Sequence, residues 1–189
     1  MALSDILLPG EHNIENYATA VCATLGFAAA EDIAYVAKTF KGVRHRLELV
    51  REKDGVRYYN SSIDSSPTRT AAAISALDRP IHIICGGYDK NIPFEPLADA
   101  LTACKFIKSV VLTGATLEKI KAALISHTDF ELSGIKVYEE RDFEAAVKLC
   151  ASKAATGECV LLSPACASFD AFPNFEVRGE AFKAIVEEL

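Results

Sequence analysis

The stretch from residue 43 to residue 189 alternates between short apolar runs and longer amphipathic segments, and this alternation constrains the fold more than any other feature of the sequence. A short apolar run is typical of a buried strand, whereas apolar residues spaced three and four apart indicate a helix. Strands that alternate with helices favour an α/β fold, a mainly parallel sheet with helices on both faces. The expected strands are Leu47–Val50, Val56–Tyr59, Ile81–Cys85, Val110–Leu112, Ile135–Tyr138 and Cys159–Leu162.

A β-hairpin is predicted at the entrance to this sheet. Asp54-Gly55 separates the first two apolar runs, and an Asp-Gly pair between two strands is a strong signal for a tight turn. Pro67 then opens the first helix, with Ser66 in the N-cap position. The expected helices are 67–77, 96–104, 117–125, 143–154 and a last one that contains Phe182 and Val186.

The first 42 residues have a different pattern. Ile6–Leu8 is a candidate for a short strand, and helical spacing predicts two helices, over residues 14–25 and 30–40. Two helices and a stub strand cannot build a core of their own. The sequence therefore predicts a boundary at Gly42, with residues 1–42 as the end of one domain and residues 43–189 as a second domain.

Composition narrows the classes of partner. The net charge is −6, and no run rich in Lys or Arg occurs, so the sequence shows no footprint for nucleic acid. No apolar run approaches the roughly 18 to 20 residues that a bilayer span needs, and the first residues do not read as a signal peptide. We expect a cytoplasmic protein that binds a small molecule and neither nucleic acid nor a membrane.

The reactive residue types form no recognised catalytic or metal motif. The six cysteines include no C-x-x-C, and the four histidines include no H-x-x-H or H-x-x-x-H pair, so neither a metal site nor a disulfide framework is expected. His82 lies inside an apolar run and is expected to be a packed or edge-strand histidine. Neither G-x-x-x-x-G-K-[ST] nor G-x-G-x-x-G occurs, so this chain holds no complete machinery for phosphate transfer.

Three segments that follow strands carry more polar groups than a turn requires. They are Asn60–Ser66, Gly86–Lys90 and Ser163–Gly179, and in a parallel sheet all three lie at one edge. Gly86-Gly87 followed by Lys90 fits either an anion site or a plain turn. The serines before Pro67 fit either an anion site at a helix N-terminus or simple N-capping. The pattern alone leaves both questions open.

The third segment, SPACASFDAFPNFEVRG, is the richest in side chains that can contact a ligand. Ser163 and Ser168 can donate hydrogen bonds, and phenylalanines such as Phe175 can wall a pocket or pack in the core. Cys166 is a conceivable nucleophile, but no histidine that could serve as its base lies in a loop on the same edge. We therefore expect Cys166 to be a packed small residue.

Four motifs, taken in order, resemble the C-terminal part of the Mur ligases, and within that family the branch that adds D-glutamate. They are GEHNIEN at residues 10–16, His45-Arg46, GGYDK at residues 86–90 and SPACASFDAFPNFEVRG at residues 163–179. The resemblance extends from about Leu8 to Leu189. GGYDK alone is a weak signal, whereas the last motif is long and specific.

The resemblance implies a fold and a reaction. Mur ligases have a domain for a UDP-sugar substrate, a central ATPase domain with a P-loop and a Rossmann-like C-terminal domain that brings the amino acid. Residues 1–42 would be the remnant of the central domain, and residues 43–189 would be the whole C-terminal domain. ATP phosphorylates the carboxylate of UDP-N-acetylmuramoyl-L-alanine, the amine of D-glutamate attacks the acyl phosphate, and an amide forms.

The resemblance also assigns roles to individual residues. The positions that match the D-glutamate site are Lys90, Ser65, Ser168 and Phe175. The positions that match the ATP site are Asn13 and Asn16 near the adenine, His45 and Arg46 between domains, and Ser61 at the ribose. No catalytic residue and no metal ligand of the family has a counterpart in this chain.

The segment after the hairpin departs from the family pattern. The family sequence reads like N-D-S-K-A-T-N, whereas this chain has NSSIDSS at residues 60–66. Ser61 replaces the aspartate that contacts the ribose and Ile63 replaces a lysine, which puts the nucleotide contacts of this loop in doubt. Asp64 is a possible substitute for the missing carboxylate. Ser65 replaces a threonine and keeps the hydroxyl.

Further expectations follow from what the chain lacks. Without the P-loop and the magnesium ligands, we expect a monomeric piece of a longer protein that holds neither ATP nor Mg²⁺ and is inactive alone. ATP and Mg²⁺ would bind in the full-length enzyme, and the UDP-sugar substrate would bind through the missing domains. Three alternatives remain: a ligase for another amino acid, including a folylpolyglutamate-type enzyme; a regulatory module that binds an anionic metabolite; and a cysteine hydrolase that uses Cys166.

Overall fold

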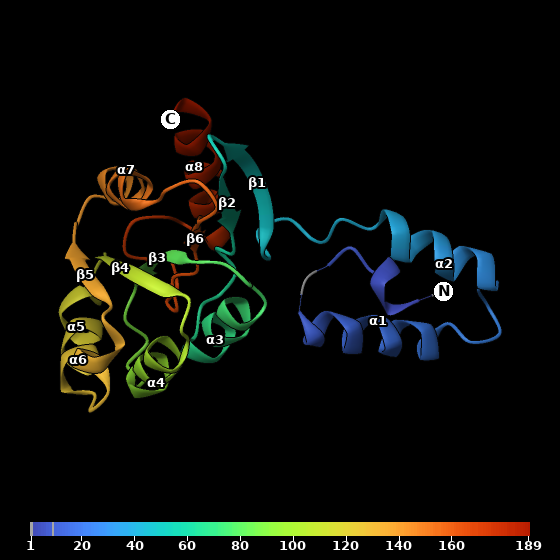
Figure 1. Ribbon diagram of the computed structural model, residues 1–189, viewed down its shortest axis with the longest axis horizontal. Helices are drawn as coiled ribbons and strands as arrows, with labels where there is room; N and C mark the ends of the chain where they lie inside the picture. Colours follow the sequence, from blue (N-terminus) through green and yellow to red (C-terminus); the bar gives the residue numbers. More distant parts are fainter. Residues whose placement is uncertain (1, 9) are drawn as a thin grey trace. The chain divides into compact units, whose positions relative to one another are not determined.

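The computed structural model describes residues 2–8 and 10–189, which form two compact units (Figure 1). Unit 1 is residues 1–43 and unit 2 is residues 44–189. The two units are described separately below. Among the described residues, no helix has both the length and the apolar character needed to cross a membrane.

Unit 2 contains one six-stranded sheet in the order β1-β2-β6-β3-β4-β5. β1 and β2 pair antiparallel, and every other neighbouring pair is parallel. The last strand of the chain, β6, thus lies between β2 and β3. The strands are β1 (Glu48–Lys53), β2 (Val56–Asn60), β3 (Ile81–Gly86), β4 (Ile107–Thr113), β5 (Lys136–Glu139) and β6 (Cys159–Leu162).

Helices cover both faces of the sheet, as the alternating pattern predicts. The helices of unit 2 are α3 (Pro67–Ser75), α4 (Glu95–Ala103), α5 (Leu117–Ser126), α6 (Phe130–Ser133), α7 (Phe143–Lys153) and α8 (Phe175–Glu188). Figure 1 shows α7 and α8 on one side of the sheet and α3 to α6 on the other. Each face has its own buried cluster, and alternate residues of β3 enter opposite clusters: Ile83 packs with the α3 to α6 side and Ile84 with the α7 and α8 side.

The hairpin is where the Asp-Gly pair predicts it. Asp54 and Gly55 have φ values of 53° and 77° between β1 and β2. Positive φ at both central residues is the conformation that favours Asn or Asp followed by Gly.

Most predicted elements of unit 2 are confirmed, with three main differences, the first of which is that β1 ends at Lys53 rather than at Val50. β4 begins at Ile107, three residues earlier than expected, because Ser109 is buried despite being polar: its hydroxyl lies 2.7 Å from Nδ1 of His82. The short helix α6 was not predicted, since four residues are too few to show a helical period. His82 is a packed histidine on a central strand, with Nε2 2.9 Å from Glu158 Oε2.

Unit 1 consists of η1 (Leu3–Asp5), α1 (Glu11–Ala23) and α2 (Ala30–Thr39). The predicted strand Ile6–Leu8 is wrong. A strand needs a neighbouring strand. In the described part of unit 1 the backbone hydrogen bonds recorded for this segment go to residues of helices, from Ile6 N–H to the Leu3 carbonyl (3.2 Å) and from Leu7 N–H to the Ala37 carbonyl (3.3 Å). Both predicted helices are present, although α1 begins three residues before the expected start.

Candidate functional site

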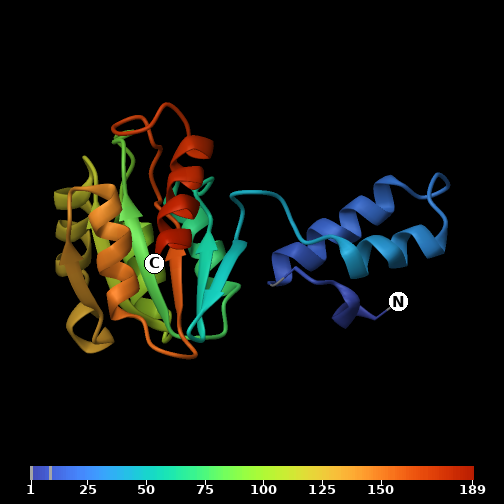
Figure 2. The same cartoon turned by 90° about the horizontal axis from the view of Figure 1, so that it is seen from above.

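The segments that follow the parallel strands gather at one edge of the sheet and are hydrogen-bonded to one another. Gly86 N–H donates to the Pro164 carbonyl (2.8 Å), and Tyr88 N–H donates to the Ala167 carbonyl (2.9 Å). In Figure 2 the green segment after β3 and the red segment after β6 meet at this end of the sheet. The β4 exit joins them, because Thr116 N–H donates to the Gly87 carbonyl (3.1 Å).

Gly87 is explained by this packing. Its φ is 148°, and a Cβ at this position would lie 2.3 Å from the Ala167 carbonyl oxygen. Only glycine allows the β3 and β6 exits to approach so closely. The glycine pair therefore has a structural role, whereas Lys90 of the same motif is exposed and available to a ligand.

Arg178 ties two of the exit segments together from the first turns of α8. Its side chain is 2% exposed, and it donates to both the hydroxyl and the carbonyl of Ser62 (3.0 and 2.8 Å). It also donates to the carbonyls of Cys166 and Ala167, each at 3.0 Å. Burial lowers the pKa of Arg178 to about 10, so the guanidinium remains charged at neutral pH. Sequence reasoning missed this residue, although a charged residue in an apolar helix pattern was a signal.

The four residues that match the D-glutamate site lie on these hydrogen-bonded exit segments or beside them. Lys90 is exposed, and within the described part of the chain its ammonium has no recorded partner. Ser65 is half-buried ahead of α3, and Phe175 begins α8, where its carbonyl accepts from the Ser62 hydroxyl (2.8 Å). Ser168 is 2% exposed, yet its hydroxyl has no hydrogen-bond partner among residues 2–8 and 10–189.

An unpartnered buried hydroxyl is unusual, because a buried polar group without a partner is destabilising. Ser168 directly follows Ala167, whose carbonyl accepts from both Tyr88 and Arg178. The backbone that carries Ser168 is therefore held while its hydroxyl is left for another acceptor or donor. Phe169 comes next, 62% exposed, and stacks edge to face on Tyr88 with the ring centroids 5.9 Å apart.

Asp64 sits in a small network of hydroxyl groups between the β2 and β6 exits. Its carboxylate accepts from the Ser163 hydroxyl (2.8 Å), which lies 2.9 Å from the hydroxyl of Thr70. Burial raises the pKa of Asp64, although hydrogen bonds from Ser61 and Ser163 act in the opposite direction. Asp64 therefore joins two loops.

Ser61 is engaged within the fold as well. Its hydroxyl accepts from the Leu47 N–H (3.0 Å), and Ser61 N–H donates to the Leu162 carbonyl (2.8 Å). The β2 exit thus presents no unengaged carboxylate at the position where the family aspartate would meet a ribose.

His45 and Arg46 differ in accessibility. His45 is 5% exposed, has a φ of 63°, and holds Nδ1 3.0 Å from Asn60 Nδ2 and Nε2 3.4 Å from a Glu180 carboxylate oxygen. Its ring packs edge to face on Phe175, with centroids 6.1 Å apart. Arg46 is exposed, so it is the member of the pair that can reach a ligand.

Ser66 and Cys166 complete the sequence-predicted set. Ser66 occupies the N-cap position of α3, but its hydroxyl lies against the Thr68 hydroxyl (3.1 Å) and caps no backbone N–H. Cys166 is 2% exposed, and burial raises its pKa to about 11 even though the Thr116 hydroxyl contacts the sulfur at 3.2 Å. A buried protonated thiol is a poor nucleophile, which argues against a cysteine hydrolase.

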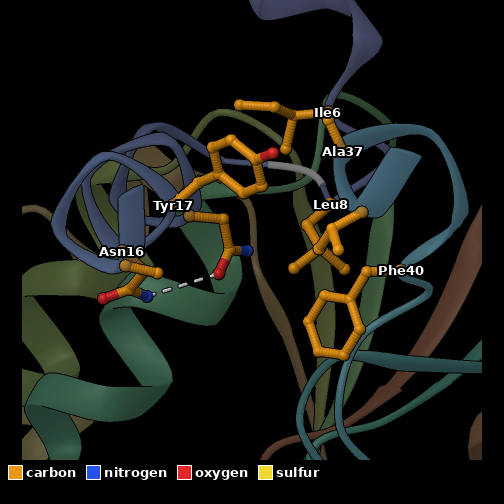
Figure 3. A pocket seen from close by; sticks show the side chains of 9 residues that line it. Ile6, Leu8, Asn16, Tyr17, Ala37 and Phe40 are labelled. Carbon is orange, nitrogen blue, oxygen red and sulfur yellow. Dashed lines mark hydrogen bonds between the residues drawn. The ribbon is translucent and has the colours of Figure 1, made fainter. Parts of the chain in front are cut away.

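Unit 1 has an apolar pocket of about 220 Å³ that includes Asn13 and Asn16 (Figure 3). Asn16 Nδ2 lies 3.5 Å from Asn13 Oδ1. In Figure 3, Asn16 lies at the side of the pocket opposite Leu8 and Phe40. The Tyr17 hydroxyl donates to the Ile33 carbonyl and so joins α1 to the start of α2. The pocket is lined by Ile6, Leu8, Asn13, Asn16, Tyr17, Ala20, Val36, Ala37 and Phe40.

Comparison with known proteins agrees with the resemblance that the motifs indicate. A family model described as Mur ligase, glutamate ligase domain, matches residues 45–166. The chain is 51% identical over 188 residues to a UDP-N-acetylmuramoylalanine–D-glutamate ligase of Clostridium novyi (strain NT), covering 100% of this chain and 41% of that protein. It is 50% identical over 185 residues to the enzyme of the same name from Clostridium beijerinckii, covering 98% and 40%.

Solved structures agree at the level of the fold. The UDP-N-acetylmuramate-alanine ligase MurC of Thermotoga maritima matches with a TM-score of 0.69 and 14% identity over 97% of this chain and 39% of that one. A folylpolyglutamate synthase of Mycobacterium tuberculosis matches with a TM-score of 0.64 and 14% identity over 94% and 41%. The chain spans about two fifths of the length of the relatives that it matches. The resemblance inferred from the motifs is thereby confirmed, and the chain belongs to the Mur ligase family, whose C-terminal domain it carries.

Proposed function

We propose that unit 2 is the D-glutamate-binding domain of an ATP-dependent amide ligase of peptidoglycan precursor synthesis. The observation that carries this proposal is the buried, unpartnered hydroxyl of Ser168, held at the sheet edge by the hydrogen bonds to Ala167. Exposed Lys90 and half-buried Ser65 supply further donors at the same edge. Relatives of 44–51% identity named as D-glutamate ligases support the choice of amino acid.

In the proposed reaction, ATP converts the carboxylate of UDP-N-acetylmuramoyl-L-alanine into an acyl phosphate. The task of this chain is to hold D-glutamate so that its amine faces that carbon. D-glutamate carries two carboxylates, and an ammonium, two hydroxyls and the N–H groups at a helix N-terminus suit them. Held at both ends, the amino acid keeps its amine free to attack, and the gain in rate comes from orientation.

The described residues fit ATP in part. The apolar pocket of unit 1, with its two asparagines, suits the flat base, and exposed Arg46 suits a phosphate. The β2 exit fits less well, because the Ser61 hydroxyl accepts from Leu47 and Ile63 is apolar. No cluster of metal-binding side chains occurs in the part of the chain that the structure describes, so Mg²⁺ would be held with ATP by other domains of the ligase.

Residues 1–42 are proposed to be the remnant of the central ATPase domain, and residues 43–189 the amino-acid-binding domain. Several large apolar side chains of unit 1 are exposed, including Phe27 (93%), Tyr35 (69%) and Leu7 (53%). Burial against the remainder of an ATPase domain would account for them, since each buried side chain of this size is worth about 1.5–3 kcal/mol. The complete ligase is proposed to act as a cytoplasmic monomer.

A chimera tests this function. The chain would replace the matching 41% of the Clostridium novyi ligase, and amide formation would be measured with ATP, UDP-N-acetylmuramoyl-L-alanine and D- or L-glutamate. We expect ligation of D-glutamate only. In the chimera, Ser168→Ala should raise KM for D-glutamate about tenfold, whereas the exposed-surface control Ser126→Ala should leave it unchanged.

The chain alone should neither ligate nor hydrolyse ATP, because it contains no P-loop. Robust amide formation by the isolated chain would contradict the proposed division of labour. A folded chimera that binds D-glutamate without ligating it would favour the regulatory alternative, and preference for another amino acid would favour a sibling ligase.

A further inference from the structure

Residues 44–47, which we call the strap, lead into β1 in a backbone conformation that is unusual for their residue types. His45 and Leu47 have φ values of 63° and 47°, although neither is a glycine. A left-handed backbone is unfavourable for side chains of this size, so such residues persist where their surroundings fix them, and they gather at functional sites. Exposed Arg46, proposed above to meet a phosphate, lies between the two.

Glu48 holds the strap from the first residue of β1. Its Oε2 accepts from the His45 N–H (2.9 Å) and from Nδ2 of Asn60 (3.3 Å). Its Oε1 accepts from the ammonium of Lys183 on α8 (3.0 Å). Burial acts to raise the pKa of Glu48, but the His45 N–H and Lys183 outweigh it and lower the pKa, so the carboxylate is ionised at neutral pH. One half-buried charge thus joins the strap, the end of β2 and α8.

The end of β2 supports the same turn. The side chain of Asn60 is fully buried, and its Nδ2 lies 3.0 Å from His45 Nδ1. The Ile63 N–H donates to the His45 carbonyl (3.2 Å), and the Leu47 N–H donates to the Ser61 hydroxyl (3.0 Å). The residues on both sides of the exposed arginine are therefore fixed to the sheet.

The side chain of Arg46 is held less firmly than its neighbours. Among residues 2–8 and 10–189, no hydrogen bond from its guanidinium is recorded, and it acts electrostatically on the buried carboxylate of Asp64. A guanidinium that is anchored mainly through its backbone keeps its N–H groups for a ligand, and its place depends on the strap.

We infer that Glu48 is a positioning residue for the ligation reaction, because it keeps the strap in its left-handed form and so presents Arg46 to the phosphates of ATP. This inference rests on the proposed function, in which Arg46 contacts ATP. Glu48 itself touches no substrate.

The isolated chain tests the hold on the strap without any ligase activity. In the nitrogen-15-labelled parent, the amides of Arg46 and Leu47 should have order parameters of about 0.85, and in Glu48→Gln these should fall below about 0.6. Glutamine has one acceptor oxygen in place of two and no charge, so it cannot keep all three contacts. Glu52→Gln, on the same strand and paired with Arg57 (2.8 Å), is the matched control and should leave the order parameters unchanged. A rigid strap in a folded Glu48→Gln protein would overturn the inference.

The ligase chimera tests the consequence for the reaction. Glu48→Gln should raise KM for ATP about three- to tenfold and leave KM for D-glutamate within about twofold, because the disturbed residues are those beside Arg46. A general loss of folded protein would lower the rate without separating the two substrates. Equal changes in both KM values, or no change in either, would overturn the inference.

A double-mutant cycle in the chimera shows whether Glu48 acts through Arg46. Arg46→Ala alone should raise KM for ATP about tenfold, and adding Glu48→Gln should raise it little further, because the side chain that the strap presents is already gone. Additive effects would mean that Glu48 acts by another route and would overturn the inference. A folded parent chimera that does not ligate would instead count against the proposed function, and the order parameters of the isolated chain would then decide whether Glu48 positions Arg46.

Discussion

The surroundings of two carboxylates of unit 2, buried Asp64 and half-buried Glu158, shift their pKa values in opposite directions. Burial dominates at Asp64 and raises its pKa, despite the hydrogen bonds from Ser61 and Ser163. Burial also acts on Glu158, but the Ala155 N–H and His82 outweigh it and lower the pKa of the carboxyl. The two residues should therefore give the stability of the protein opposite dependences on pH.

The effect of Asp64→Asn on the free energy of unfolding should become more favourable as the pH rises. The raised pKa means that ionised Asp64 destabilises the folded state above that pKa, and this penalty disappears below the unfolded value near 3.8. The difference in free energy of unfolding, variant minus parent, should increase between about pH 4 and pH 8. Urea denaturation across this range measures it, and a flat or falling difference would contradict the assignment.

Glu158→Gln should show the reverse trend. A lowered pKa means that ionised Glu158 stabilises the folded state above its unfolded value near 4.5, and this contribution is lost as the pH falls through the folded value. The variant should be clearly less stable than the parent at pH 5.5, and the gap should close toward pH 3. Glu176→Gln, on the exposed side of α8, is the control and should show little change with pH.

At the scale of single residues, some of the site could be predicted from the sequence and some could not. Motif matching could name Lys90 and Ser168, because a match needs only sequence order. It could not show that Ser168 is buried without a partner or that Asp64 is bound by Ser163, since these facts arise from contacts about 100 residues apart. The contacts of Arg178 could not be predicted for the same reason: a charged residue in a helix pattern was visible, but its acceptors, the Ser62 hydroxyl and three backbone carbonyls, lie on other segments.

The elements of unit 2 were largely predictable because each satisfies its own period and also packs in the sheet. β3 and β6 are buried along their whole length, so continuous apolar runs mark them clearly. The prediction of a strand at Ile6–Leu8 was wrong, because an apolar run indicates only that a segment is buried and does not define its backbone conformation. The partner strand that would decide its conformation is not part of described unit 1.

Helix α8 offers a test of close packing between elements. A Cβ on Gly179 would lie 2.2 Å from His45 Nδ1, and His45 is itself held by Asn60 and Glu180. Alanine favours a helix by about 1 kcal/mol over glycine, but overpacking typically costs about 1–3 kcal/mol, and here a fixed ring would have to move. We expect Gly179→Ala to lower the free energy of unfolding by about 1–2 kcal/mol, measured by urea denaturation.

A double-mutant cycle isolates the cause of that loss. Adding His45→Ala removes the ring that the new methyl group meets, so the double variant should be more stable than the sum of the single changes predicts. Strict additivity would mean that Gly179 is required for another reason.

At the scale of the molecule, the two units differ sharply in how much they bury. Ala37 is the one buried residue among the described side chains of unit 1, whereas all six residues of β3 are buried. Local stability follows buried apolar contact. We expect amides of α1 and α2 to exchange with deuterium many-fold faster than amides of β3 and β6 at neutral pH. Protection of α1 equal to that of β3 would contradict this.

The edge strand β1 has a further consequence for the behaviour of the whole molecule in solution. Its pairing with β2 shifts register between Leu49 and Arg51, and Arg51 donates to the carbonyls of Val186 and Glu187 (2.6 and 2.9 Å) at the end of α8. An irregular edge whose arginine is tied to a helix end is a poor template for another strand. Pairing of a further strand, and with it sheet-to-sheet polymerisation, is thereby discouraged at this edge.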